Sequence, residues 1–292
     1  ISNLIAYKFS KLYNSKLFIH PLDKAHFFGG CHYNSGCFNY LNNCKNCPAV
    51  PFYNNNLPFK KFAKQSLLST HFNLIYHIPW MKKYINSLNH LNFKNTYFVS
   101  AEQPKDLSSN NRDFLKKKFG FSDYITVLFG TTNFQDYHKG YHLAEKVILE
   151  LDKSLVNKKI MIITVGHNPC KIPIKNLNHK HFDFIDNRSE FIEIYKISDI
   201  ILSTVIDDLG PGILLEAIMC GCVPVSFNVG MAKDLITNNF NGIIIDNFDV
   251  RLMVNHLKKM IVESKWSELK YNNDIMIKKY NNKIQNSDQL SS

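Results

Sequence analysis

The feature that most constrains this chain is a regular alternation of short apolar runs and amphipathic segments across residues 124–264. The apolar runs are rich in Ile and Val without intervening polar residues, as expected of strands buried on both faces. Such strands separated by helices predict an α/β fold with a parallel, doubly wound sheet. We expect strands at 124–130, 159–166, 181–186, 199–206, 223–227 and 242–246, and helices at 140–155, 189–198, 212–220 and 250–264.

The first hundred residues or so follow a less regular pattern. Residues 46–59, NCPAVPFYNNNLPF, carry three prolines, which argue against a regular helix or strand there. We expect a short strand at 17–23, two helices within 59–90 around a strand at 74–78, and a strand at 96–100. The polar segment 101–111 is the best candidate for a domain boundary. The sequence therefore predicts a partial first domain at 1–108, a second domain at 109–264 and a polar C-terminal helix or tail at 265–292.

The positive charge of the chain is concentrated in its first part. Residues 1–108 hold 12 Lys and Arg against 3 Asp and Glu, whereas residues 109–292 hold 23 against 21, within a total of +11. A basic region favours an anionic partner, such as acidic lipid headgroups, phosphorylated substrates or nucleic acid. The alternative is a Lys- and Asn-rich composition without such a partner. The lysines that lie at helical spacing among apolar residues, as suits an anionic membrane surface, are Lys60, Lys61, Lys64, Lys82 and Lys83.

Four of the seven cysteines fall within residues 29–48, GGCHYNSGCFNYLNNCKNCP. No apolar run reaches the roughly 18 residues that span a membrane, and no signal peptide is visible, which predicts a cytoplasmic protein in which structural disulfides are rare. The spacing C-x5-C-x6-C-x2-C ends in a Cys-x-x-Cys pair of the kind that binds zinc. It predicts a structural zinc site, with His32 as a substitute ligand; reduced thiols or two disulfides are the alternative. The predicted ligands are Cys31, Cys37, Cys44 and Cys47.

The most informative stretch is DIILSTVIDDLGPGILLEAIMCGCVPVSF, residues 199–227. It reads as a strand, an acidic turn with two glycines, a helix and a second strand, and ligands of parallel sheets bind where strands end in this way. Backbone N–H groups at the start of the helix can meet an anion. Glu216, one turn further on, can accept two hydrogen bonds from a vicinal diol such as a ribose. The alternative is a tight turn followed by a solvated glutamate.

These segments together resemble the nucleotide-sugar site of retaining glycosyltransferases of family 4, which have the GT-B fold of two facing Rossmann-like domains. In that family an acidic residue, seven intervening residues and a Glu frame this turn, and here Asp208 and Glu216 hold those places. YITVLFGTTNFQDYHKGYHLAEKVI resembles the first strand of the donor domain, with Lys139–Gly140 as its Lys-Gly pair. EAIMCGCVPVSFNVG resembles the run that leads to the family's Gly-rich loop. The resemblance covers residues 124–264.

The first part of the chain resembles one bacterial subgroup of the family, which builds surface polysaccharides, through LDKAHFFGGCHYNSGCFNYLNNCKNCP. Asp23 stands in the Asp place of the subgroup's His-Asp pair, but Leu22 occupies the His place and Phe28 the place of a usual Thr. The second domain lacks a common Arg, for which His138 is the nearest basic residue. About three strands expected at the start of the first domain, with a Gly-rich turn, are absent, so we expect the first domain to be incomplete.

The resemblance implies transfer of a sugar, with retention, from a nucleotide-diphosphate donor to a glycan or lipid-linked acceptor in polysaccharide or lipopolysaccharide synthesis. The basic helices predict a peripheral position on the inner face of the cytoplasmic membrane, for which a solvated helix face is the alternative. No catalytic cofactor is expected, because a lysine and a helix N-terminus can stabilise the leaving diphosphate without a metal. Asp208 and Asp23 are the expected catalytic residues beside the transferred sugar. The expected donor-binding residues are Lys139, Gly210, Pro211, Gly212, Ile213, Leu214 and Glu216.

Three other functions fit parts of the pattern. A sugar-nucleotide epimerase or hydrolase would use the same donor half, and an inactive fragment of the transferase would retain its motifs. A nucleic-acid-binding zinc module would explain the basic region and the cysteines. No RNA-binding signature or helix-turn-helix accompanies them, however, so we expect no nucleic-acid partner.

Overall fold

The computed structural model describes residues 3–51, 56–99, 107, 111–169, 171–210, 212–273 and 275–276. The chain forms two compact units. Unit 1 lies within Ile1–Ala101 and includes Asp207–Leu209, and unit 2 lies within Glu102–Ile206 and Gly210–Lys283. Most of the predicted linker at 101–111 falls outside the described residues. Each unit is described by itself.

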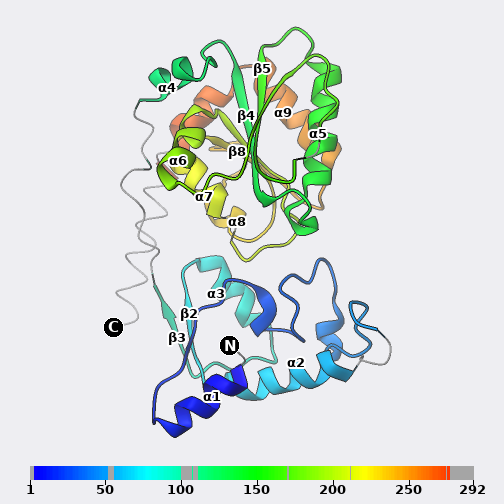
Figure 1. The fold of residues 1–292 in the computed structure, drawn as a ribbon, viewed down its shortest axis with the longest axis vertical. Coiled ribbons are helices and arrows are strands. Elements are labelled where there is room, and N and C mark those ends of the chain that lie inside the picture. Colours follow the sequence, from blue (N-terminus) through cyan, green and yellow to red (C-terminus); the bar gives the residue numbers. More distant parts are fainter. Residues whose placement is uncertain are drawn as a thin grey trace. The chain divides into compact units, whose positions relative to one another are not determined.

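Unit 2 is built on a six-stranded sheet in the order β6-β5-β4-β7-β8-β9, in which every neighbouring pair is parallel (Figure 1). Numbered from β4, this is the Rossmann order 3-2-1-4-5-6, so the direction of winding reverses between β4 and β7. That point is where open parallel sheets bind their ligands at the carboxyl ends of the strands. The strands are β4 (Ile125–Asn133), β5 (Ile160–His167), β6 (Asn178–Phe182), β7 (Ile200–Ser203), β8 (Val223–Phe227) and β9 (Ile243–Ile245).

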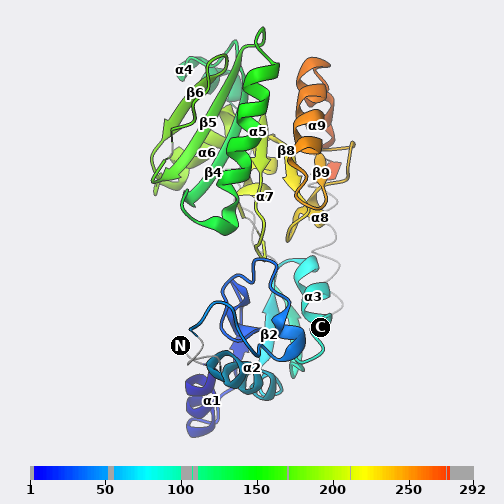
Figure 2. The same cartoon turned by 90° about the vertical axis from the view of Figure 1, so that its right-hand side faces the viewer.

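Helices cover both faces of this sheet (Figures 1 and 2). On one face, α5 (Tyr141–Ser154) contacts α9 (Val250–Val262); on the other, α6 (Arg188–Ile197) contacts both α4 (Arg112–Lys118) and α7 (Gly212–Met219). The short helix α8 (Ala232–Leu235) follows β8. The apolar residues of α5 recur at the i, i+3, i+4, i+7 spacing of a helix that buries one side. They are Ala144, Val147, Ile148 and Leu151, all fully buried in the core.

The predicted elements of residues 124–264 are present, most of them within one or two residues of their expected ends. The predicted strand at 181–186 is wrong by about three residues, since β6 spans Asn178–Phe182. It is a polar strand, NHKHF, at the edge of the sheet, where no apolar run is needed. The strand predicted at 199–206 ends already at Ser203, because the chain beyond it hydrogen-bonds to the turn after β4: Ile206 N donates to His138 O over 2.9 Å. The helices α4 and α8 were not predicted.

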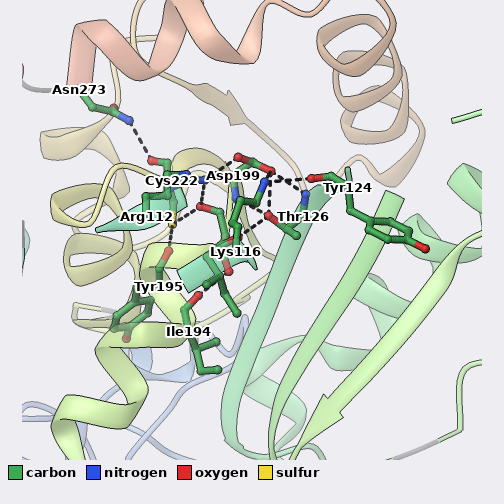
Figure 3. Close-up of polar contacts among 11 residues, drawn as sticks. Arg112, Lys116, Tyr124, Thr126, Ile194, Tyr195, Asp199, Cys222 and Asn273 are labelled. Atoms are coloured by element: carbon green, nitrogen blue, oxygen red, sulfur yellow. Dashed lines mark hydrogen bonds and ion pairs between the residues drawn. The ribbon is translucent and has the colours of Figure 1, made fainter. Parts of the chain in front are cut away.

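A buried ionic network ties α4 to the start of β7, at the amino ends of the strands (Figure 3). Arg112 Nη2 lies 2.5 Å from Asp199 Oδ1, and Lys116 Nζ lies 2.7 Å from Asp199 Oδ2. Thr126 N on β4 donates to the same carboxylate over 2.8 Å. Burial opposes ionisation of Asp199, but Arg112 and Lys116 outweigh it and hold the pKa of that carboxyl below its usual range. The network therefore fixes α4 and the β4–β7 pair at the edge opposite the expected ligand edge.

Unit 1 contains a smaller parallel sheet of three strands in the order β1-β2-β3. Its helix α1 contacts α2, as Figure 2 shows, and α3 contacts β2. Bulky side chains such as Phe27, Leu74 and Met81 are fully buried in this unit. The strands are β1 (Phe18–Ile19), β2 (Asn73–Tyr76) and β3 (Asn95–Phe98), and the helices are α1 (Asn3–Leu12), α2 (Asn56–Ser69) and α3 (Pro79–Asn86).

The two sheets confirm the predicted α/β class with parallel strands in both halves of the chain. The predicted strand at 17–23 shrinks to Phe18–Ile19, because the chain then turns into a short 3-10 helix, η1, at Lys24–His26. Residues 266–273 are helical, as expected of the C-terminal segment, whereas its predicted disordered end lies outside the described residues. None of the helices described is long and apolar enough to span a bilayer.

Candidate functional site

The candidate site lies at the carboxyl ends of β4 and β7, where the winding of the unit 2 sheet reverses. The turn after β4 packs against the end of β7, where Thr204 Oγ1 donates to Gly140 O over 2.8 Å. A Cβ atom added at Gly140 would lie 1.8 Å from Thr204 O, and Gly140 also has a φ of +71°. Only glycine fits there, so Gly140 is needed to pack this turn against β7.

Lys139 is placed by that docked turn. It ends the 3-10 helix η4 (Tyr137–Lys139) directly before Gly140, and its N–H donates to Asp136 O over 3.0 Å. The side chain is half-buried. Its backbone is thus held at the switch point, which is where a cation for a bound diphosphate is needed.

The start of α7 lies beside β4. A Cβ atom added at Gly130 would lie 2.6 Å from Ile213 Cδ1, whereas one added at Gly212 would meet no atom within 4 Å. The first N–H groups of a helix have no partner within it and carry partial positive charge. The exposed Gly212, followed by Ile213 and Leu214, therefore presents backbone N–H groups in an open position. Gly210 precedes this turn, and Pro211 lies outside the described residues.

Glu216 is held by two side chains from α6. Tyr195 Oη donates to Glu216 Oε2 over 2.9 Å, and Arg188 Nη1 lies 3.0 Å from Glu216 Oε1. Tyr195 is 1% exposed, and burial, with the nearby Glu216 carboxylate, raises the pKa of its hydroxyl, so Tyr195 stays a donor. Arg188 is about half exposed. The carboxylate is thus fixed on its buried side and reachable on the side of Arg188.

The two expected catalytic aspartates lie in different surroundings. Asp208 is 8% exposed and belongs to Asp207–Leu209, the short segment between β7 and α7 that groups with unit 1. Asp23 caps η1 and lies in unit 1: its Oδ1 accepts from Ala25 N over 2.8 Å, and its Oδ2 lies 2.7 Å from His32 Nδ1. Leu22, in the place of the family's His, is 77% exposed. Both oxygens of Asp23 therefore have protein partners.

The four cysteines of the segment 29–48 are free thiols that share one loop. Burial raises the pKa of Cys44 to about 11, and the other three cysteines add to the shift. Among the residues that the structure describes, however, no three His, Cys, Asp or Glu side chains are arranged to hold a metal ion. The zinc site stays a prediction.

The sequence did not single out Tyr195 or Arg188. Tyr195 carried a signal that could have been used, because a tyrosine on the apolar side of a helix must find a partner for its hydroxyl. Arg188 is one of three arginines in the chain, but its pairing with Glu216, 28 residues away, has no local signature.

Comparison with known proteins supports the same reading of the donor half. Residues 111–278 match the family described as Glycosyl transferases group 1. No curated protein matches the chain.

Solved structures are similar to both halves of the chain at low sequence identity. One is sucrose-phosphate synthase from Thermosynechococcus elongatus, with a TM-score of 0.71 at 12% identity over 99% of this chain and 70% of that one. Another is Anabaena HepE in complex with UDP-glucose, with a TM-score of 0.67 at 13% identity over 99% and 74%. A third is WaaG, a glycosyltransferase involved in lipopolysaccharide biosynthesis, with a TM-score of 0.64 at 14% identity over 92% and 75%. These similarities show the fold, which is that of GT-B glycosyltransferases.

Proposed function

The chain belongs to the glycosyl transferases group 1, and on that premise we propose that it moves a sugar from a nucleotide-diphosphate donor to the hydroxyl of a glycan or lipid-linked acceptor, with retention of the anomeric configuration. The observation that carries the proposal is the arrangement at the switch point of unit 2. An open helix N-terminus, the docked Lys139 turn and a glutamate with a fixed carboxylate lie on one edge of one sheet.

Each part meets one demand of the reaction. Negative charge develops on the leaving diphosphate, and the N–H groups at the start of α7, together with the Lys139 ammonium, would stabilise it. Glu216 would accept hydrogen bonds from the two ribose hydroxyls, with Tyr195 holding the carboxylate in place. Asp208 and Asp23 would lie beside the transferred sugar, where a carboxylate favours positive charge on the anomeric carbon. No step requires a cofactor.

A uridine donor is the first to test, because HepE, which has a similar fold, has been crystallised with UDP-glucose. Calorimetry of the full chain with UDP, GDP and ADP measures binding directly. We expect one of them to bind. Failure of all three at millimolar concentration, with the protein folded, would refute the proposal.

Glu216→Gln tests the ribose contact. It keeps the shape but weakens charge-assisted hydrogen bonds that contribute about 1.5–3 kcal/mol each, so nucleotide affinity should fall at least about tenfold. Glu190→Gln, at an exposed position in the first turn of α6, is the matched control and should leave affinity unchanged.

Lys139→Ala tests the diphosphate contact. The lysine charge would face the outer phosphate, so UDP should lose more affinity than UMP. Equal losses for both nucleotides would mean that Lys139 does not contact the outer phosphate.

Asp208→Asn should leave UDP binding nearly intact and lower transfer from the sugar nucleotide. Nuclear magnetic resonance of the product would show whether the anomeric configuration is retained.

We further propose that the protein acts in the synthesis of a bacterial polysaccharide or lipopolysaccharide, from the cytoplasmic side of the membrane. The support is the basic charge of residues 1–108 and the exposed lysines of α2 and α3. Such a surface suits anionic headgroups, where a lipid-linked acceptor would be met. Flotation with anionic and neutral vesicles tests this, and equal, weak binding to both would contradict it. No nucleic-acid partner is part of the proposal.

A further inference from the structure

Unit 1 holds a cavity of about 350 Å³ that the donor site does not use. Its walls come from η1, the cysteine-rich segment, α1 and α2. The polar residues that line it and matter here are Asp23, His26, His32, Lys61, Lys64 and Gln65. The volume falls at the lower end of the range typical of small-molecule sites.

One wall carries a buried acceptor without a donor. Gln65 is 6% exposed, and its Nε2 donates to Ala25 O over 2.9 Å, which fixes the orientation of the amide. Its Oε1 has no hydrogen-bond partner in the part of the chain that the structure describes. A buried acceptor without a donor is unfavourable. Protein atoms cover this oxygen, so a ligand hydroxyl would relieve it after a small shift of the cavity wall.

The same cavity carries positive charge that is not neutralised. Lys61 and Lys64 lie three residues apart on exposed positions of α2, and neither forms an ion pair with any other described residue. Among the described residues of the wall, the acidic one is Asp23, whose carboxylate already accepts from Ala25 N and contacts His32. The two ammonium groups are therefore available to an anion.

Gly30 makes room for one of these ammonium groups. A Cβ atom added there would lie 2.4 Å from Lys61 Nζ, and Gly30 has a φ of +113°. The loop thus takes a conformation suited to glycine where the ammonium lies over it.

We propose that this cavity binds a phosphorylated sugar, with the phosphate between Lys61 and Lys64 and a sugar hydroxyl donating to Gln65 Oε1. The proposal rests on the proposed function and names the acceptor class: a sugar whose phosphate is either free or lipid-linked. The cavity offers cations for the phosphate and an amide oxygen for a hydroxyl, which are the two contacts that such a ligand needs.

The experiment is calorimetry of the full chain with α-glucose 1-phosphate, inorganic phosphate and methyl α-glucoside as probes, in the presence of saturating UDP to fill the donor site. Glucose 1-phosphate should bind more tightly than either other probe. Lys61→Ala combined with Lys64→Ala should weaken it at least about tenfold, since two charge-assisted contacts are lost. Lys60→Ala, at an exposed position of the same helix outside the cavity, is the matched control and should change nothing.

Gln65→Leu separates the two contacts. It should weaken the binding of glucose 1-phosphate and leave that of inorganic phosphate unchanged, and Trp80 fluorescence in a Trp266→Phe background reports whether unit 1 is still folded. Phosphatidylcholine vesicles with and without phosphatidic acid distinguish the sources: binding to the anionic vesicles that the double lysine variant loses and the Lys60→Ala variant keeps indicates a lipid-linked phosphate. If the double lysine variant still binds the anionic vesicles but binds glucose 1-phosphate more weakly, the ligand is a sugar with a free phosphate.

Two outcomes overturn the inference. One is absence of glucose 1-phosphate binding by a chain that binds UDP, which leaves the proposed function standing. The other is an equal loss of affinity in the Lys60 variant and the double variant, which would mean diffuse charge attraction only. A chain that binds no nucleotide would instead fail the proposed function.

Discussion

The two units of this protein are both parallel α/β structures, yet they are held together differently. Unit 2 has strands of up to nine residues and a large core against α5 and α9. In unit 1, β1 has two residues, and the cysteine-rich segment turns through left-handed backbone at Ser35, Asn43, Cys44 and Asn46. Long apolar strands and helices with periodic burial build the core of unit 2, whereas the core of unit 1 gathers side chains such as Phe27, Leu74 and Met81 from shorter elements and turns. We therefore expect changes to single residues to act mainly on the unit in which they lie.

The two tryptophans allow the unfolding of each unit to be followed separately. Trp80 stacks on Tyr84 in unit 1, with ring centroids 5.0 Å apart, and Trp266 packs against the core of unit 2. Trp80→Phe leaves a chain whose fluorescence reports unit 2, and Trp266→Phe leaves one that reports unit 1. Urea unfolding of each variant then follows one unit at a time.

The largest effect is expected from Asp199→Ala. It leaves the buried Arg112 and Lys116 without their carboxylate, which should cost about 3–5 kcal/mol of unfolding free energy. The loss should appear in the Trp266 signal of unit 2 and not in the Trp80 signal. Asp123→Ala is the control, because its pair with Lys159 is mostly exposed and should contribute less than about 1 kcal/mol. An equal loss of unfolding free energy in both units would mean that the Asp199 network does not stabilise unit 2 selectively.

Zinc should act on the other unit. If the four cysteines bind it, zinc at about a hundredfold excess over its dissociation constant should stabilise unit 1 by about 2.7 kcal/mol, and a chelator should remove that gain. Cys44→Ser should abolish the response, and Cys220→Ser, in unit 2, should keep it. Zinc content well below one per chain, with all four thiols titrating freely, would contradict the site.

A smaller effect is expected from Tyr195→Phe, which tests whether unit 2 positions Glu216 through this hydroxyl. Loss of the hydrogen bond should lower UDP affinity about fivefold, equivalent to ~1 kcal/mol, without moving the unfolding of unit 1. Tyr271→Phe, at an exposed position, is the control. Calorimetry with UDP measures both. Unchanged affinity in Tyr195→Phe would mean that Arg188 alone orients the carboxylate.

The smallest expected effect is a difference between the two units in how much unfolding free energy each loses at acidic pH. Burial lowers the pKa of three histidines in unit 1, which are His26, His77 and His90. In unit 2 it lowers the pKa of His142 and His179. A histidine with a lowered folded pKa contributes stability that is full above the unfolded value of about 6.5 and is lost as pH falls toward the folded value.

Unit 1 should therefore lose slightly more stability than unit 2 between about pH 7.5 and about pH 5.5. His90→Gln, which removes an imidazole whose Nε2 lies 2.7 Å from Phe27 O, should reduce that difference. His71→Gln, at an exposed position, should not. Unfolding of the two reporter variants at each pH measures the difference, and a greater loss in unit 2 would reverse the comparison.

The pattern of residues predicted unit 2 better than unit 1. The buried strands β4, β5, β7 and β8 are apolar runs that only a sheet covered on both faces can bury, so their position was readable. The edge strand β6 was misplaced because its polar sequence carries no such signal. The helices α1, α4 and α8 were missed, and α4 and α8 have seven and four residues, too few for a helical period to stand out.

The sequence by itself determined the alternation of the main strands and helices along residues 124–264, the glycine-containing turn after β7 and the glutamate one turn into α7, because these are local features. Tertiary structure alone decided which side chains meet. Asp199 accepts hydrogen bonds from Thr126 and Arg112, which lie 73 and 87 residues away in the sequence. Glu216 accepts one from Tyr195 on another helix. Residue periodicity encodes which face of an element is buried. It does not encode which element lies against that face, and the order of the strands in the sheet decides this.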